Sequence, residues 1–251
     1  MIRDASPADL PLIRTILVDA NDAPYEIGPV LEEKCFGPGV AGPPRVRIWE
    51  DAGLAVSCGK FLRLLAVRRD RRGRGIGTAL LRDANPSVIA AEPGNYFLPG
   101  VPERDAGFFL RRGYAETAAA WNLHVNLKSV PGSEFDLRVP VDQVAEFVKR
   151  EFGSIWAFEV ARCAAAILIP GVAFAVIEAN NRGLGTFGPT GVAKAHRGKG
   201  HGRTVLLAAL AELGRLGYTR AIIPWTDATE FYRRSCGAEL AHRFFTLTVN
   251  R

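Results

Sequence analysis

The sequence predicts an α/β (α+β) chain that is built from two similar halves. Segments of strand-like apolar sequence alternate with segments of helical periodicity along all 251 residues. A glycine-rich turn between a strand and a helix occurs twice, at residues 67–81 and 192–206. The elements around the two turns follow in the same order, and this repetition indicates an internal duplication.

The first series begins with a helix-start signal at residues 6–9. Ser6 can cap a helix, Pro7 suits its first turn, and Asp9 faces the positive end of the helix dipole. Apolar residues then recur at helical spacing through Leu17. The elements expected in this half are a strand at 1–5, a helix after Ser6, a loop at 37–44, a hairpin at 46–49 and 54–59, a strand at 61–68 and a helix at 77–83.

The second series follows a Pro-Gly-Ser turn at 131–133. Its expected elements are strands at 135–139, 164–169, 172–179, 187–195, 221–224 and 244–249, and helices at 141–148, 202–216 and 228–234. Both series therefore run from a strand and a helix, through a meander, to the glycine-rich turn and its helix. We expect two domains, at 1–130 and 131–251.

Composition narrows the class of protein. Hydrophobic residues make up 48% and charged residues 23%, which are ordinary values for a globular chain. The formal net charge of +6 is compatible with nucleic acid, an anionic membrane or a small polyanionic cofactor as partner. None of the four cysteines has CxxC spacing, so we expect no metal site. The N-terminus lacks an apolar signal core, and the longest apolar run, 164–177, is cut by Pro170-Gly171, so we expect a cytoplasmic protein without a membrane span.

The two glycine-rich turns share the pattern Arg-x-x-Gly-x-Gly, with a valine five residues before the arginine. A helix N-terminus leaves backbone N–H groups without partners and carries partial positive charge. Glycines let an anion approach this backbone closely, and flanking Arg and Lys add charge, so a pyrophosphate would fit. The turns are neither a Walker A loop nor a dinucleotide fingerprint, because Thr78 and Arg203 stand where the third glycine should be. The alternative is a solvated basic loop.

These turns, Arg-Gly-Arg-Gly-Ile-Gly at 72–77 and Arg-Gly-Lys-Gly-His-Gly at 197–202, resemble the acetyl-CoA pyrophosphate loop of GCN5-related N-acetyltransferases, the GNAT superfamily. Residues 106–114 and 228–238 resemble the helix that ends in Tyr-x-x-x-Gly-Phe in that family. The resemblance spans nearly the whole chain as two tandem copies. It implies two GNAT-like domains, each with a mixed, mostly antiparallel central sheet flanked by helices.

The resemblance also implies acetyl-CoA (coenzyme A) as cofactor. Its pantetheine would pair with the strand before each loop, and its pyrophosphate would sit on the loop amides. The implied cofactor-binding residues are Leu65, Val67, Arg72, Gly73, Arg74, Gly75, Ile76, Gly77 and Thr78 in the first half, and Val192, Arg197, Gly198, Lys199, Gly200, His201, Gly202, Arg203 and Thr204 in the second.

The implied reaction is direct attack of an amine on the thioester, with a tyrosine of the late helix protonating the departing thiolate. Tyr232 occupies that position in the second half, whereas the first half has Phe109. We therefore expect the second half to carry the chemistry, with packing of Tyr232 as the alternative. The general base stays open among Glu178, Glu212, Glu230, Asp227, His196 and His201.

Two other readings of function remain. The chain could be a non-catalytic acyl-CoA-binding or scaffold protein. Phe109 favours this reading for the first half. The arginine-rich segment 68–74 is the sole feature that favours nucleic acid, and no helix-turn-helix or zinc finger accompanies it, so we expect no nucleic-acid partner. The expected acceptor is an amine of a small molecule or peptide. Tandem copies could pair internally, which favours a monomer.

Overall fold

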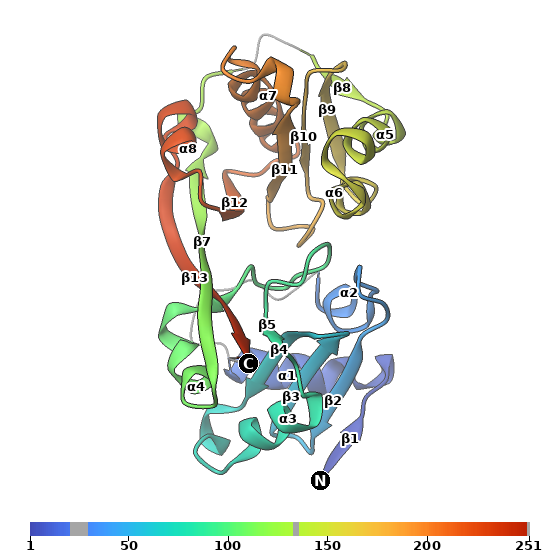
Figure 1. Cartoon of the computed structure of the whole chain (residues 1–251), viewed down its shortest axis with the longest axis vertical. Coiled ribbons are helices and arrows are strands. Elements are labelled where there is room, and N and C mark those ends of the chain that lie inside the picture. The colour runs from blue at the N-terminus through green and yellow to red at the C-terminus, as the bar shows by residue number, and fades with distance from the viewer. Residues whose placement is uncertain (21–29, 133–135, 250–251) are drawn as a thin grey trace. The chain divides into compact units, whose positions relative to one another are not determined.

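The computed structural model describes residues 1–20, 30–132 and 136–249 (Figure 1). Its chain divides into two compact units. The first comprises Met1–Ala119 and Phe244–Arg251, and the second comprises Ala120–Arg243. The closing strand of each sequence half thus ends in the unit formed mainly by the other half. The units therefore do not coincide with segments 1–130 and 131–251, and that boundary stays a prediction about the sequence repeat.

The first unit contains a mixed sheet. Strands β1 to β4 are antiparallel neighbours, β5 is parallel to β4, and β13 pairs antiparallel with β5 and β6. The strands are β1 (Ile2–Asp4), β2 (Arg45–Trp49), β3 (Gly53–Cys58), β4 (Phe61–Val67), β5 (Val88–Ile89), β6 (Val101–Pro102), the start of β7 (Tyr114–Asn126) and the end of β13 (Glu239–Val249). The helices are α1 (Leu10–Ala20), α2 (Leu31–Phe36), α3 (Ile76–Ala84) and α4 (Ala106–Leu110).

Helices cover both faces of this sheet, with α1 and α3 on opposite sides (Figure 1). The alternation of side chains along β3 produces this arrangement. Leu54 and Val56 belong to the core cluster of α1, which includes Ile16. Ala55 belongs to the core cluster of α3, which includes Leu80. The unit is therefore a three-layer helix–sheet–helix structure.

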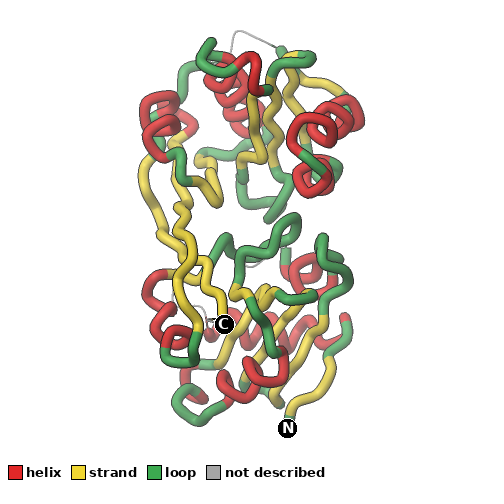
Figure 2. Tube along the Cα trace, in the orientation of Figure 1, coloured by secondary structure: helices red, strands yellow, loops and turns green. Residues whose placement is uncertain are grey.

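The second unit repeats this plan. Strands β11, β10, β9 and β8 form an antiparallel sheet in that order, and β12 pairs antiparallel with β7. Helix α5 packs on one face with Val144 and Phe147, and α7 packs on the other (Figure 2). The elements are β8 (Arg138–Val139), α5 (Val141–Phe152), α6 (Ser154–Val160), β9 (Ala165–Ile169), β10 (Ala173–Ile177), β11 (Phe187–Val192), α7 (His201–Arg215), β12 (Arg220–Thr226) and α8 (Thr229–Cys236).

Most expected elements are present, with some differences. A 3₁₀ turn, Pro7–Asp9, precedes α1, and the Asp9 carboxylate accepts the Ser6 backbone N–H at 2.9 Å. The expected strand at 187–195 ends at Val192, because residues 194–196 turn into a 3₁₀ helix before the loop. Strand β13 begins five residues before the expected 244, and α2 and α6 were not expected. The predictions for Ser133 and Phe135 concern residues outside the described ranges.

None of the helices within the described ranges is long and apolar enough to cross a membrane.

Candidate functional site

The two glycine-rich loops have the same backbone conformation. In each, a strand leads into a short 3₁₀ turn, Arg69–Arg71 or Lys194–His196, and a helix begins five residues after that turn ends. The φ angles are 77° and 80° at Gly73 and Gly75, and 76° and 86° at their counterparts in the second loop. Side chains other than glycine rarely adopt these angles. A Cβ added at any of these four glycines would meet no atom within 4 Å, so an anion can reach the backbone.

The helix after each loop contacts the late helix of its unit in the same way. A Cβ at Gly77 would lie 3.3 Å from Phe108 of α4, and a Cβ at Gly202 would lie 3.6 Å from Phe231 of α8. In both loops the arginine Nε donates to the carbonyl of the preceding valine at 3.2 Å. This register makes Phe109 and Tyr232 structural counterparts.

The strand that enters each loop separates from its parallel neighbour. Strand β4 pairs with β5 only at its start, through Phe61↔Val88 and Leu62↔Ile89. In the second unit a single bridge, Thr186↔Ile222, marks the same point. The register shifts at Arg63 in β4 and within 187–190 in β11, so each strand carries a bulge. A bulge leaves backbone groups outside the ladder, where a ligand can meet them.

A cavity of about 750 Å³ lies in the first unit along this opening. It extends from β4 past the loop to α4 and to the segment 97–102. All cofactor-binding residues expected in the first half line it except Arg74. Its lining combines basic side chains of the loop and of the region around α4 with apolar ones such as Leu62, Ala90 and Phe97.

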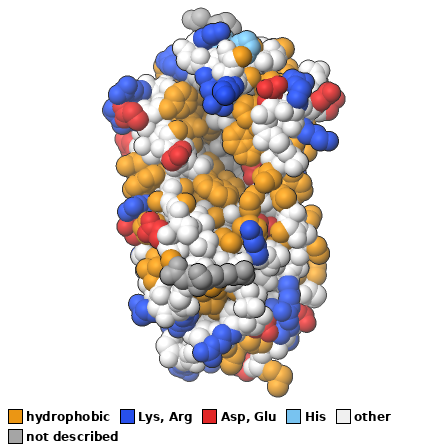
Figure 3. Space-filling view, in the orientation of Figure 1, with side chains coloured by type: hydrophobic (Ala, Val, Ile, Leu, Met, Phe, Trp, Pro, Cys, Tyr) orange, Lys and Arg blue, Asp and Glu red, His pale blue; other side chains and the backbone are white. Residues whose placement is uncertain are grey.

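The loops differ in how their charges are balanced. In the first, Arg68 and Arg71 pair with Asp51 and Asp70 at 3.2–3.7 Å. Around the second, no carboxylate of the described residues lies within ion-pair distance of four basic side chains, Lys194, Arg197, Lys199 and Arg203. On the face of the molecule in Figure 3, basic and acidic side chains are interspersed. The second loop therefore offers an anion more positive charge that no described carboxylate balances.

The sequence analysis missed the cluster around Arg112. Its guanidinium donates to the Thr78 hydroxyl at 2.7 Å and to the Phe108 carbonyl at 2.6 Å. It also stacks on the Phe108 ring, 3.7 Å from the ring centroid. Arg112 lines the cavity together with Arg104 and Arg111. The consecutive arginines at the end of the late helix were the available signal.

Tyr232 is buried in the core of the second unit. Its ring makes edge contacts with Phe187 and Phe231, and the residue is 6% exposed. Burial raises the pKa of its phenol, with the Cys236 thiol and Asp227 adding to the shift. Its hydroxyl forms no hydrogen bond with a described residue, and the raised pKa keeps the phenol protonated at neutral pH.

Three of the candidate bases are engaged in structural contacts. The Glu178 carboxylate accepts two backbone N–H groups of the loop that follows β10. Glu212, also buried, pairs with Arg215 at 2.6 Å. Glu230 is exposed, and its hydrogen bond from Arg233 lowers the pKa of the carboxyl to about 2. These contacts favour structural roles for the three glutamates.

The remaining candidate bases, His196, His201 and Asp227, lie near the second loop and α8, as do Trp225 and Cys236. The rings of His196 and His201 flank the loop with centroids 6.4 Å apart. Trp225 occupies a bulge of β12 at a φ of 50°, and its backbone N–H donates to the Asn122 Oδ1 at 3.1 Å. Cys236 is buried, and its thiol lies 3.2 Å from the Tyr232 carbonyl. The structure thus brings Tyr232, Cys236 and Asp227 together but identifies no general base.

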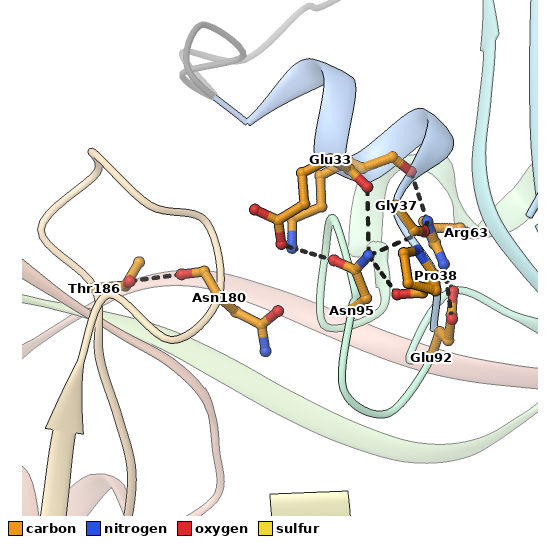
Figure 4. A network of polar contacts seen from close by, with 9 residues as sticks. Glu33, Gly37, Pro38, Arg63, Glu92, Asn95, Asn180 and Thr186 are labelled. Carbon is orange, nitrogen blue, oxygen red and sulfur yellow. Dashed lines mark hydrogen bonds and ion pairs between the residues drawn. The ribbon is translucent and has the colours of Figure 1, made fainter. Parts of the chain in front are cut away.

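A buried polar network holds the wall of the first unit's cavity (Figure 4). Arg63 and Glu92 form a two-armed ion pair at 2.6 and 2.9 Å, and both side chains are fully buried. Lys34, 1% exposed, donates to Asn95 at 2.6 Å. The Asn95 amide in turn donates to three carbonyls of the segment 33–38. The network therefore ties α2 and the segment 90–100 to the bulge in β4.

Comparisons with known proteins agree with this geometry. Residues 142–238 match the model of the acetyltransferase (GNAT) family. No curated protein matches the chain in sequence. The family match, which covers the second loop and α8, supports a GNAT acetyltransferase.

Solved structures show the same fold at low identity. The GCN5-related glucosamine N-acetyltransferase region of a fungal multi-domain GH3 β-N-acetylglucosaminidase aligns with a TM-score of 0.75 and 17% identity, over 98% of this chain. The chain spans only 38% of that protein. A GCN5-related N-acetyltransferase from Sphaerobacter thermophilus aligns with a TM-score of 0.68 and 18% identity, over 98% of this chain and 94% of its own. A tandem GNAT protein from the clavulanic acid biosynthesis pathway gives 0.68 and 16%, over 99% and 98%.

Proposed function

We propose that the chain is an acetyl-CoA-dependent N-acetyltransferase that acts on a primary amine of a small molecule or peptide. The observation that carries the proposal is the glycine-rich loop between a separating, bulged strand and a helix, present twice with the same φ angles. A diphosphate fits there, because the glycines leave open space over helix N-terminal amides. We further propose two tandem GNAT-like copies that meet near residue 130, in a cytoplasmic monomer.

The second unit is our proposed site of transfer. Bound acetyl-CoA would supply an acetyl thioester, which is an activated acyl group. The loop amides with Arg197 and Lys199 would hold its diphosphate, and the bulged part of β11 would face its pantetheine. Tyr232 would hold its phenolic proton for the thiolate that departs when the amine attacks the carbonyl. Positioning of the two reactants supplies much of the rate.

For the first unit a second function is favoured, namely binding of acyl-CoA without transfer of the acyl group. Its counterpart of Tyr232 is Phe109, which is buried and has no proton to donate. The single carboxylate among the residues lining its cavity is Asp105. The cavity therefore offers a cofactor loop without a matching acid.

A matched pair of charge reversals tests the proposal. Arg74 and Lys199 occupy the same position in the two loops and are exposed, so Arg74→Glu and Lys199→Glu should leave folding intact. Each should weaken acetyl-CoA binding at its own loop about tenfold in calorimetry. Thiol release with a panel of amines should fall with Lys199→Glu and persist with Arg74→Glu.

The alternatives give different results. Loss of thiol release with Arg74→Glu alone would assign transfer to the first unit. Saturable binding without thiol release for any amine would favour the acyl-CoA-binding function. Absence of acetyl-CoA binding to the wild type would refute the acetyltransferase proposal.

A further inference from the structure

The lining of the first unit's cavity includes three arginines that lie outside the pyrophosphate loop. Arg104, Arg111 and Arg112 come from the turn before α4 and from its C-terminal end. The acidic residue among them is Asp105, 3.6 Å from the Arg104 Nε. This part of the cavity therefore carries net positive charge beyond the loop.

Arg112 is held in a fixed position. Its Nε and Nη2 both point to the Thr78 hydroxyl, at 3.2 and 2.7 Å, and its Nη1 donates to the Phe108 carbonyl. The guanidinium plane stacks on the Phe108 ring. A guanidinium has five N–H donors, so at least two remain for a ligand. Since the side chain is already ordered, a ligand meets little entropic cost in using them.

Arg111 is kept available by a glycine. Its side chain has no hydrogen bond or ion pair with any described residue, and a Cβ at Gly107 would lie 3.2 Å from its Nη1. In the second unit the counterpart of Gly107 is Glu230, which pairs with Arg233 and Arg234. Arg234 is the counterpart of Arg111. At this helix position Gly107 therefore leaves Arg111 room in the first unit, whereas Glu230 neutralises Arg234 in the second.

The positions of Arg104 and Arg112 also carry less positive charge in the second unit. Counting from Phe108 and Phe231, the counterpart of Arg104 is Asp227 and that of Arg112 is Ser235. At these three positions the second unit therefore has one arginine, Arg234, and Glu230 pairs with it. The difference between the units is specific to the surface beyond the pyrophosphate loop.

We propose that Arg104, Arg111 and Arg112 form a subsite of the first unit for a phosphomonoester, the 3′-phosphate of coenzyme A. This rests on the proposed function, since it takes the diphosphate of the same molecule to lie on the Arg72–Thr78 loop. A phosphomonoester carries close to two negative charges at neutral pH, and planar guanidinium groups bind it through paired hydrogen bonds. The first unit thereby selects 3′-phosphorylated coenzyme A, and the second unit does not.

The test compares coenzyme A with 3′-dephospho-coenzyme A by calorimetry on the full chain. The double variant Lys199→Glu/Gly202→Asp weakens the second loop and isolates the first unit. Gly202 has no positive φ, and a Cβ there makes only ordinary contacts, so the variant should fold. In this background we expect coenzyme A to bind about tenfold more tightly than its dephospho form, and the ratio to shrink in high salt.

Arg111→Ala should reduce the ratio to about threefold or less, and Arg111→Lys should restore part of it. Arg82→Ala removes the same charge from exposed α3, outside the cavity lining, and should leave the ratio unchanged. Equal binding of the two ligands by the full chain with Lys199→Glu/Gly202→Asp would overturn the subsite and leave the proposed function standing. So would a ratio that Arg111→Ala does not change. No binding of either ligand to the wild type would overturn both.

Discussion

Glu92→Gln tests the buried network in the first unit. The substitution keeps the size of the side chain but removes the charge that faces the Arg63 guanidinium at 2.6 and 2.9 Å. Both side chains are fully buried, so water cannot replace the carboxylate as the partner of the guanidinium. Arg63 retains two carbonyl acceptors at 2.8 and 3.0 Å, but these do not neutralise it. Removing one partner of a buried ion pair leaves the other charge buried without compensation, which lowers the free energy of unfolding by about 3–5 kcal/mol.

For a chain of this length that cost corresponds to a fall in Tm of roughly 6–20 °C. The assay is thermal unfolding followed by circular dichroism, with urea unfolding to confirm the change in free energy. The control is Glu230→Gln, which breaks exposed ion pairs and should change Tm little. A fall in Tm of under about 2 °C for Glu92→Gln would refute the reasoning, because the guanidinium would then have to be solvated or otherwise neutralised.

Three further results are expected. Gly39→Ala should destabilise the first unit, because its Cβ would lie 1.6 Å from a Glu92 carboxylate oxygen; unchanged urea unfolding would contradict this. Burial, with Arg220 and His242 adding, lowers the pKa of His124. The unfolded chain then binds the proton more tightly, so stability should fall as pH drops below about 6.5, and His124→Gln should flatten that part of the profile. Tyr232→Phe should lower kcat about 10²-fold and leave the Kd of acetyl-CoA unchanged; an unchanged kcat would assign the tyrosine to packing.

The glycine-rich loops could be predicted from sequence because their cause is local. Only glycine adopts the φ angles at Gly73, Gly75 and their counterparts without strain, and a strand and a helix flank each loop in the sequence. The helices α1, α5 and α7 were predictable for a similar reason, since apolar spacing reports the face that will be buried.

The remaining features depend on partners distant in sequence. Arg63 stands inside an apolar strand, and nothing near it indicates that Glu92, 29 residues later, will neutralise it. The alternation of apolar residues in β13 predicts a strand, but it does not indicate which unit's sheet the strand joins. The cavity, and the role of Arg111 and Arg112 in lining it, arises only when α4 packs beside the loop.

The placement of β13 affects how the protein can be made. Its final residues pair with β5 and β6, so the first unit needs a strand that the ribosome synthesises only after the rest of the second unit. Until then β5 presents an open edge, which is a template for pairing with other chains. The second unit, in contrast, has its β7 partner before its own sheet begins. Loss of the last ten residues should therefore impair the unit at the opposite end of the sequence, and the first 130 residues expressed alone should aggregate.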